Sequence, residues 1–106
     1  MTLFPLISVK PKVKVPTQVL GAPLGSDVTM ECQIEASPKP VNYWTRENGD
    51  MLISSTKYQV LEKVESYEIT FTLRIRGVEE RDFGSYNCTA KNVLGESEGS
   101  IQLIGK

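Results

Sequence analysis

A strict alternation of apolar and polar residues between Ile69 and Arg76 constrains the fold of this chain more than any other feature. Ile, Phe, Leu and Ile occupy the odd positions 69–75, and Thr, Thr, Arg and Arg occupy the even positions 70–76. Successive side chains of an extended strand point to opposite faces, so a period of two predicts a half-buried β-strand. Residues 28–35 repeat this pattern and predict a second strand of the same kind.

Strand and turn signals continue at short intervals along the rest of the chain. An edge strand that Pro16 breaks in two is expected over residues 13–20, because proline cannot donate to a sheet ladder. No helical period persists, and only residues 60–68 resemble a helical turn. Seven to nine short strands with turns between them predict one all-β domain, a Greek-key β-sandwich of two antiparallel sheets. The remaining expected strands are 41–46, 51–53, 58–61, 86–90 and 101–103, with turns at 21–25, 37–40, 47–50 and 91–95.

The charge balance and the missing histidine exclude several functional classes. Twelve basic and thirteen acidic residues leave a net charge of −1, which argues against non-specific binding of nucleic acid or anionic membranes. Without histidine the chain cannot form a Ser-His-Asp or Cys-His catalytic arrangement or a His-ligated zinc site. Glu79, Glu80 and Asp82 lie in a tight turn that lacks the ligand spacing of a calcium loop. We therefore expect no enzyme, no cofactor and no metal site.

Two cysteines, Cys32 and Cys88, lie 56 positions apart. Their number alone leaves both a disulfide and two free thiols open, because nothing in the sequence completes a metal site around them. Residues 1–9 lack a basic start and are interrupted by Pro5, so they do not resemble a signal peptide. No stretch approaches the roughly 20 apolar residues of a membrane span. We expect this chain to be a piece of a longer protein, with Met1 as an added residue.

The order of several residues on these strands resembles that of I-type (I-set) immunoglobulin domains. The resemblance implies an inter-sheet disulfide between Cys32 and Cys88, with Trp44 packed over it. It also implies a bond from the Tyr86 hydroxyl to the backbone upstream, the tyrosine corner, and an ion pair between Asp82 and Lys57. The core signature implied in this way is Trp44, Leu73, Asp82, Gly84 and Tyr86. The motifs that carry the resemblance are Cys32, Trp44, Leu73-x-Ile75, Asp82-x-Gly84-x-Tyr86-x-Cys88 and Ala90-x-Asn92-x-x-Gly95.

A narrower resemblance is to the third immunoglobulin domain of the insect lachesin and DIP neuronal receptors, relatives of the vertebrate IgLON proteins. It implies a domain at residues 13–104, a linker or added arm at 1–12 and a tail at 105–106. It further implies a non-catalytic, extracellular, membrane-proximal spacer in a cell-adhesion receptor that is GPI-anchored or secreted. Neighbouring immunoglobulin domains would flank it, and another domain would bind the cell-surface partner. The matching segments are 21–25, 28–32, 42–49, 57–58 and 90–96.

Two other functions stay open at this point. The domain could itself be adhesive and form a homodimer or bind a partner, either through the apolar N-terminal arm or through one sheet face. That face would expose Tyr43, Thr45, Asn87 and Thr89. Alternatively, the chain could be an intracellular muscle-type immunoglobulin scaffold with two free thiols, which a thiol titration would reveal.

One asparagine departs from the family pattern, and another lies in a modification motif. Asn42 lies two residues before Trp44 and so is expected to face the core, where its amide needs partners or a position near the rim. Asn87-Cys88-Thr89 fits the acceptor rule for N-glycosylation, and strand parity turns Asn87 outward. Rapid disulfide formation at Cys88 would compete with this modification.

Exposed lysines and tyrosines have simpler interpretations than binding patches. Lys10, Lys12 and Lys14 are expected to be solvated residues of an edge strand, where charge discourages aggregation between sheets. For the three tyrosines that could form an aromatic patch, partial burial on strands is expected. These are Tyr43, Tyr58 and Tyr67.

Overall fold

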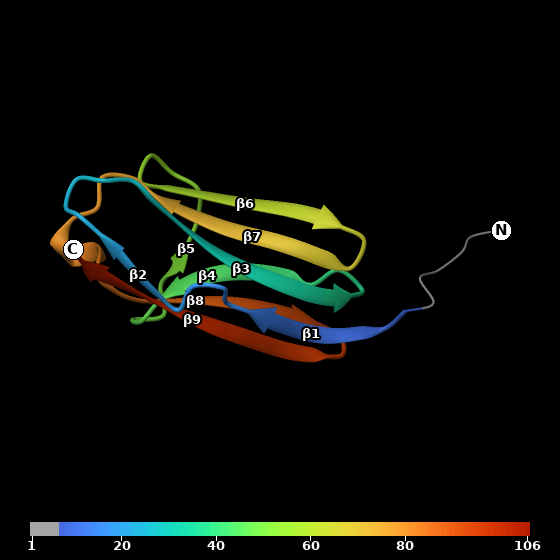
Figure 1. Cartoon of the computed structure of the whole chain (residues 1–106). Helices are drawn as coiled ribbons and strands as arrows, with labels where there is room; N and C mark the ends of the chain where they lie inside the picture. The colour runs from blue at the N-terminus through green and yellow to red at the C-terminus, as the bar shows by residue number, and fades with distance from the viewer. Residues whose placement is uncertain (1–6) are drawn as a thin grey trace.

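Two β-sheets pack face to face in residues 7–106, the part of the chain that the computed structural model describes (Figure 1). The first sheet has the strand order β1-β3-β7-β6, and the second has the order β2-β9-β8-β4-β5. The predicted all-β sandwich is confirmed. The strands are β1 Val9–Lys14, β2 Val19–Ala22, β3 Val28–Ser37, β4 Val41–Arg46, β5 Met51–Leu52, β6 Tyr58–Glu65, β7 Glu68–Ile75, β8 Gly84–Asn92 and β9 Gly95–Gly105, with a 3-10 helix η1 at Glu80–Asp82.

The alternating residues that predicted β3 and β7 fill the space between the sheets. The four apolar residues of β7, Ile69 to Ile75, are at most 3% exposed. On β3, Met30, Cys32 and Ile34 are at most 1% exposed and pair in register with Leu73, Phe71 and Ile69. The core is therefore built from the inward-facing residues of strands that the period of two predicts.

One strand pair departs from the predicted antiparallel arrangement. β2 pairs in parallel with β9, so that Val19 lies opposite Gln102. Pro16 lies between β1 and β2, and there the chain crosses from the edge of the first sheet to the edge of the second. Because proline cannot continue the ladder, the break falls at this residue. The predicted broken strand exists, but its two halves belong to different sheets.

The strand β6 is longer than the sequence predicts. It continues to Glu65 and pairs with β7 over its whole length, so the alternative of a helical turn in residues 60–68 is wrong. β1 begins at Val9, which pairs with Ser37 of β3, and β9 continues to Gly105. The domain limits 13–104 stay a prediction, and residues 1–6 of the expected arm lie outside the described residues.

The chain enters and leaves the domain at opposite ends. β1 starts at one end of the sandwich, and β9 ends at the other (Figure 1). The described chain measures 54 × 22 × 21 Å along its principal axes. No helix within residues 7–106 has the length and apolar character needed to cross a membrane.

Candidate functional site: the sheet junction and the outer faces

A disulfide between Cys32 on β3 and Cys88 on β8 joins the two sheets, with the two Cα atoms 6.7 Å apart. Trp44 on β4 pairs with Cys88 and is fully buried. Its ring stacks on that of Phe71 in the opposite sheet, with ring centroids 5.5 Å apart and an interplanar angle of 16°. The disulfide implied by the resemblance is confirmed, and residues 7–106 contain no free cysteine.

The hydroxyl of Tyr86 is held at both of its hydrogen-bonding positions. It donates to the carbonyl oxygen of Asp82 over 2.6 Å, which is the geometry of a tyrosine corner. It accepts a hydrogen bond from Nη1 of Arg46 over 3.0 Å, and the guanidinium carbon lies 4.4 Å from the centroid of the Tyr86 ring. Burial raises the pKa of Tyr86 above its ordinary value, so the hydroxyl stays neutral.

Arg46 is a residue that the sequence reasoning missed. Besides contacting Tyr86, its guanidinium donates to the carbonyl oxygens of Arg81 and Phe83 over 3.2–3.3 Å. One signal was present in the sequence, because Arg46 shares the inward parity of Trp44. A charged residue at that parity needs polar partners inside the rim. Arg46 therefore links β4 to Tyr86 and to the backbone of the turn around η1.

Asp82 is only 2% exposed, and its carboxylate contacts the ammonium of Lys57 at 2.6 Å. The same oxygen accepts a hydrogen bond from the backbone N–H of Glu79. Partial burial of Lys57 lowers its pKa, but the hydrogen bond and charge of Asp82 outweigh burial and raise the pKa overall. The expected ion pair is thus present, and it ties the turn around η1 to the start of β6.

Glu79, a second acidic residue of this turn, faces two cations. Glu79 contacts Arg81 at 2.9 Å and Lys57 at 3.5 Å. Within the described part of the chain, no three Asp, Glu, Cys or His side chains are grouped so that they could hold a metal ion. Gly84 follows the turn with a φ of 128°, a backbone conformation that residues with a Cβ rarely adopt. The turn is organised by ion pairs and backbone geometry.

Asn42 meets a partner that the sequence did not predict. Its Nδ2 donates to Oε1 of Glu62 on β6 over 2.6 Å, and Lys39 lies 2.9 Å from the other carboxylate oxygen. Glu62 pairs with Phe71 and so has inward parity at the sheet edge. Burial raises the pKa of Glu62, but Lys39 and Asn42 outweigh it, so the pKa lies below the ordinary value. These three residues form a polar latch between the two sheets, and in the described residues the Oδ1 of Asn42 has no partner.

The outer face of the second sheet carries the candidate glycosylation motif. Asn87 lies between Thr45 on β4 and Ser100 on β9. Its Oδ1 accepts a hydrogen bond from the hydroxyl of Ser100 over 2.7 Å, and its side chain is half-buried. Thr89, the third residue of the motif, is only 3% exposed. The hydroxyl that a glycosylating enzyme must recognise is therefore covered in the folded domain.

The three tyrosines do not form a common patch. Tyr43 lines a hollow beside Val41 and Val93, Tyr58 lines another beside Arg46, and Tyr67 lines a third. Tyr43 and Tyr58 are half-buried on strands. Tyr67 lies in the β6–β7 turn and is 36% exposed, so the expectation of strand burial is wrong for this residue.

The outer face of the first sheet is polar, and its groups bond to one another. Thr70 donates to Gln33 over 3.2 Å, and Arg74 contacts Asp27 at 2.9 Å. A hydrogen bond from the backbone N–H of Gly77, and to a smaller extent one from Arg74, holds the pKa of Asp27 below its usual range. At the edge of this sheet, the exposed lysines of β1 are Lys10, Lys12 and Lys14. This face offers few free groups for a partner.

Comparisons with known proteins agree with this geometry. An immunoglobulin-domain family model matches residues 10–92. Lachesin from Drosophila melanogaster is 37% identical over 95 residues, which cover 89% of this chain and 26% of lachesin. Neuronal cell adhesion molecule from Rattus norvegicus is 37% identical over 82 residues, which cover 77% of this chain and 6% of that protein.

Among solved structures, the crystal structure of Dpr2 Ig1-Ig2 in complex with DIP-Theta Ig1-Ig3 contains a chain that superposes with a TM-score of 0.90 at 36% identity. The superposition covers 93% of this chain and 33% of that chain. This chain thus spans about a quarter of lachesin and a third of the solved chain. The family match extends over most of the sequence, and the chain belongs to the immunoglobulin domain family, with relatives among neuronal cell-surface adhesion proteins.

Proposed function

We propose that this immunoglobulin domain is a non-catalytic spacer in a neuronal cell-adhesion receptor, and that another domain of the receptor binds the partner. The placement of the chain ends carries this proposal, because β1 starts at one end of the sandwich and β9 ends at the other (Figure 1). Segments joined before β1 and after β9 are held apart by the length of the domain. The disulfide joining the sheets makes that length resistant to unfolding.

The outer face of the first sheet supports a spacer more than a binding module. A specific interface usually buries about 800 Å² per partner around an apolar or aromatic anchor. On this face Gln33, Thr70 and Arg74 are engaged in hydrogen bonds or ion pairs. Within residues 7–106, Leu61 is the exposed large apolar side chain with outward parity on this face, at 55% exposed. One isolated leucine does not make an anchor.

The disulfide also supports an extracellular location, since such bonds persist in oxidising compartments. We place the domain at the cell surface, as the membrane-proximal third domain of a GPI-anchored or secreted protein whose anchor lies outside this chain. Other immunoglobulin domains would precede it, as in the solved DIP-Theta Ig1-Ig3 chain. The partner would be a second immunoglobulin protein at the cell surface, by analogy with the Dpr2 complex.

A chimera of DIP-Theta Ig1-Ig3 tests the spacer role. This chain replaces the DIP-Theta segment on which it superposes, and binding to immobilised Dpr2 Ig1-Ig2 is measured on a biosensor. A spacer predicts that the chimera keeps the Kd of unaltered DIP-Theta and that the isolated 106-residue chain gives no response. A response from the isolated chain would assign binding to the domain itself. Lost binding by a chimera that circular dichroism shows to be folded would contradict a spacer role for this position.

An adhesive function is the second candidate, and one observation favours it. A hollow of about 540 Å³ on the rim of the second sheet is lined by Val41, Tyr43 and Val93. Val41 is 69% exposed and Val93 is 89% exposed, and clustered exposed apolar residues mark interaction sites. If this hollow forms a homodimer, sedimentation of the chain shows a dimer that Val41→Lys dissociates and Val19→Lys, on β2, does not. A chain that stays monomeric as its concentration rises rejects this homodimer.

We also propose that Asn87 carries an N-linked glycan. Because Thr89 is covered in the folded domain, the glycan must be added before the disulfide at Cys88 closes. Secreted protein should lose mass on treatment with a glycan-cleaving amidase, and Asn87→Gln should lose this response while Asn48→Gln keeps it. Cys32→Ser leaves the motif intact and removes the competing disulfide, so its occupancy should rise. Absence of a glycan from both the unaltered chain and Cys32→Ser would reject the site.

A further inference from the structure

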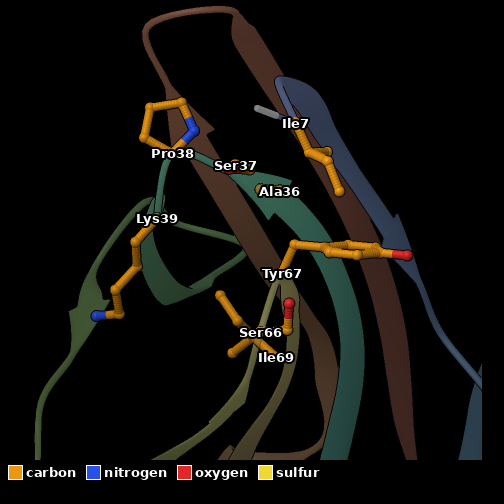
Figure 2. Close-up of a pocket in the computed structure, with 8 residues that line it drawn as sticks. All are labelled: Ile7, Ala36, Ser37, Pro38, Lys39, Ser66, Tyr67 and Ile69. Carbon is orange, nitrogen blue, oxygen red and sulfur yellow. The ribbon is translucent and has the colours of Figure 1, made fainter. Parts of the chain in front are cut away.

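The turns at the two ends of the sandwich differ in character. At the end where the chain enters, the β3–β4 and β6–β7 turns border a largely apolar groove of about 470 Å³, beside Pro38 and Tyr67 (Figure 2). At the opposite end, the β4–β5 turn at residues 47–50 has the sequence Glu-Asn-Gly-Asp, and all four residues are exposed. An Asn-Gly step is chemically reactive, because glycine has no side chain to shield its amide nitrogen from the asparagine amide before it.

Three of the four asparagines of this chain lie on strands, where their side chains are restrained. Nδ2 of Asn42 donates to a carboxylate oxygen, and Oδ1 of Asn87 accepts a hydrogen bond from a hydroxyl on β9. Nδ2 of Asn92 donates to two backbone carbonyl oxygens. Each of these three asparagines is followed by a residue with a side chain. The fourth, Asn48, lies in the exposed turn and is followed by glycine.

The hydrogen bonds of the turn polarise the side-chain amide of Asn48. Its Oδ1 accepts a hydrogen bond from the backbone N–H of Asp50 over 3.0 Å, and its Nδ2 donates to Oδ2 of Asp50 over 3.0 Å. An N–H on a carbonyl oxygen stabilises the negative charge that develops there when a nucleophile attacks the carbonyl carbon. Gly49 has a φ of 89°, and the space that a Cβ would occupy there is empty within 4 Å. Its N–H donates to the carbonyl oxygen of Arg46 over 2.9 Å, and opening one such bond in an exposed turn costs little free energy.

We propose that Asn48 is a site of spontaneous deamidation, and that its isoaspartyl product opens the turn that positions Arg46. The amide nitrogen of Gly49 bonds to Cγ of Asn48 as the Cγ–Nδ2 bond breaks. The proton of the Gly49 amide passes through solvent to Nδ2, which leaves as ammonia, and a succinimide ring remains. Water then adds to one ring carbonyl and breaks its bond to nitrogen, which gives aspartate or isoaspartate according to the carbonyl attacked. Water from the solvent is the co-reactant, and no atom is oxidised or reduced.

Isoaspartate at position 48 changes the backbone that holds Arg46, because the main chain then runs through the former side chain and gains a carbon atom. Two backbone hydrogen bonds close the turn, from Gly49 to the carbonyl of Arg46 and from Arg46 to the carbonyl of Asp50, each over 2.9 Å. The longer chain cannot keep both in the same geometry. Since Arg46 donates to the hydroxyl of Tyr86 and to carbonyl oxygens around η1, these contacts weaken as well. This inference does not depend on the spacer role.

The test ages the folded 106-residue chain in mildly alkaline buffer and locates the modified residues by peptide mass spectrometry. Isoaspartate is measured separately, by methyl transfer from S-adenosylmethionine with an isoaspartate-specific methyltransferase. Asn48 should convert before the three asparagines on strands, and the isoaspartyl fraction should melt about 4 °C or more below the unaged chain. Asn48→Asp adds the charge without lengthening the backbone, so it should melt closer to the unaltered chain. The matched control Asn48→Gln should accept no methyl groups, because its longer side chain closes a less favourable ring.

Each of three results would overturn the proposal. If Asn48 converts only after urea has unfolded the chain, the folded turn protects the amide instead of activating it. If methyl transfer to aged Asn48→Gln equals that to the aged unaltered chain, the isoaspartate lies at another residue. If the isoaspartyl fraction melts together with the unaged chain, the turn does not position Arg46. In every case the chimera experiment on the spacer role keeps its own outcome.

Discussion

Replacement of Trp44 by alanine should destabilise this domain more than any other single substitution outside the disulfide. The indole is fully buried, stacks on Phe71 across the sheets and lies beside Cys88 on the neighbouring strand. Truncation of a buried aromatic residue to alanine costs about 3–5 kcal/mol, because a cavity remains where the ring was. A domain of this size has a total stability of about 5–15 kcal/mol, so the loss is a large share of it.

Urea unfolding followed by far-ultraviolet circular dichroism measures this loss without relying on the fluorescence of the single tryptophan. For an m-value of about 2 kcal/mol/M, a loss of about 4 kcal/mol lowers the midpoint by roughly 2 M. Trp44→Phe is the matched control and should lose much less, because Nε1 of Trp44 has no hydrogen-bond partner in residues 7–106 and a ring is retained. A Trp44→Ala midpoint within about 0.3 M of the unaltered protein would refute the placement of this ring in the core.

Three further predictions concern charge and the disulfide. Lys57→Met should cost about 3–5 kcal/mol in urea unfolding, because it leaves the buried carboxylate of Asp82 without its cation, and adding Asp82→Asn should recover part of the loss. The pKa of Glu62 in the folded protein lies below its value in the unfolded chain. The contribution of Glu62 to folding stability is therefore present above the unfolded pKa and is lost as pH falls through the folded pKa. Glu62→Gln should therefore lose less stability than the unaltered chain between about pH 5 and pH 2. The control Glu65→Gln changes an exposed residue and should follow the unaltered chain. An equal dependence of stability on pH in all three proteins would contradict the latch. Intact mass after alkylation should show no alkyl groups on folded protein without reductant and two with it, and two groups without reductant would favour the intracellular scaffold.

The parts of the fold that the sequence predicts well are those that depend on local periodicity. β3 and β7 are central strands with one buried face, so a period of two identifies both their extent and their inward residues. β6 lies at an edge, where Glu62 and Lys63 interrupt the apolar pattern, and its second half was not predicted for this reason. Pro16 marks where a ladder must stop, but a proline does not specify which sheet the chain joins next.

Local periodicity does not predict which side chains bond to each other across or between strands. Strand parity places Asn42 toward the core, but it does not say that Glu62, twenty residues later, provides the hydrogen bond. Arg46 likewise contacts the hydroxyl of Tyr86, forty residues away on the neighbouring strand β8. The first contact depends on the packing of the two sheets and the second on which strands pair, and no local pattern contains either. The family resemblance supplied Lys57 and Asp82 because their pairing recurs with the motif.

The gap between two membranes joined by the receptor tests the spacer role most directly. Vesicles carrying the membrane-anchored DIP-Theta chimera are mixed with vesicles carrying Dpr2, and the gap at their contacts is measured by electron cryomicroscopy. A matched chimera that lacks this domain should bind with the same Kd but hold the membranes closer, by up to the 54 Å length of the domain. An unchanged gap, or a Kd that weakens when the domain is removed, would contradict the account.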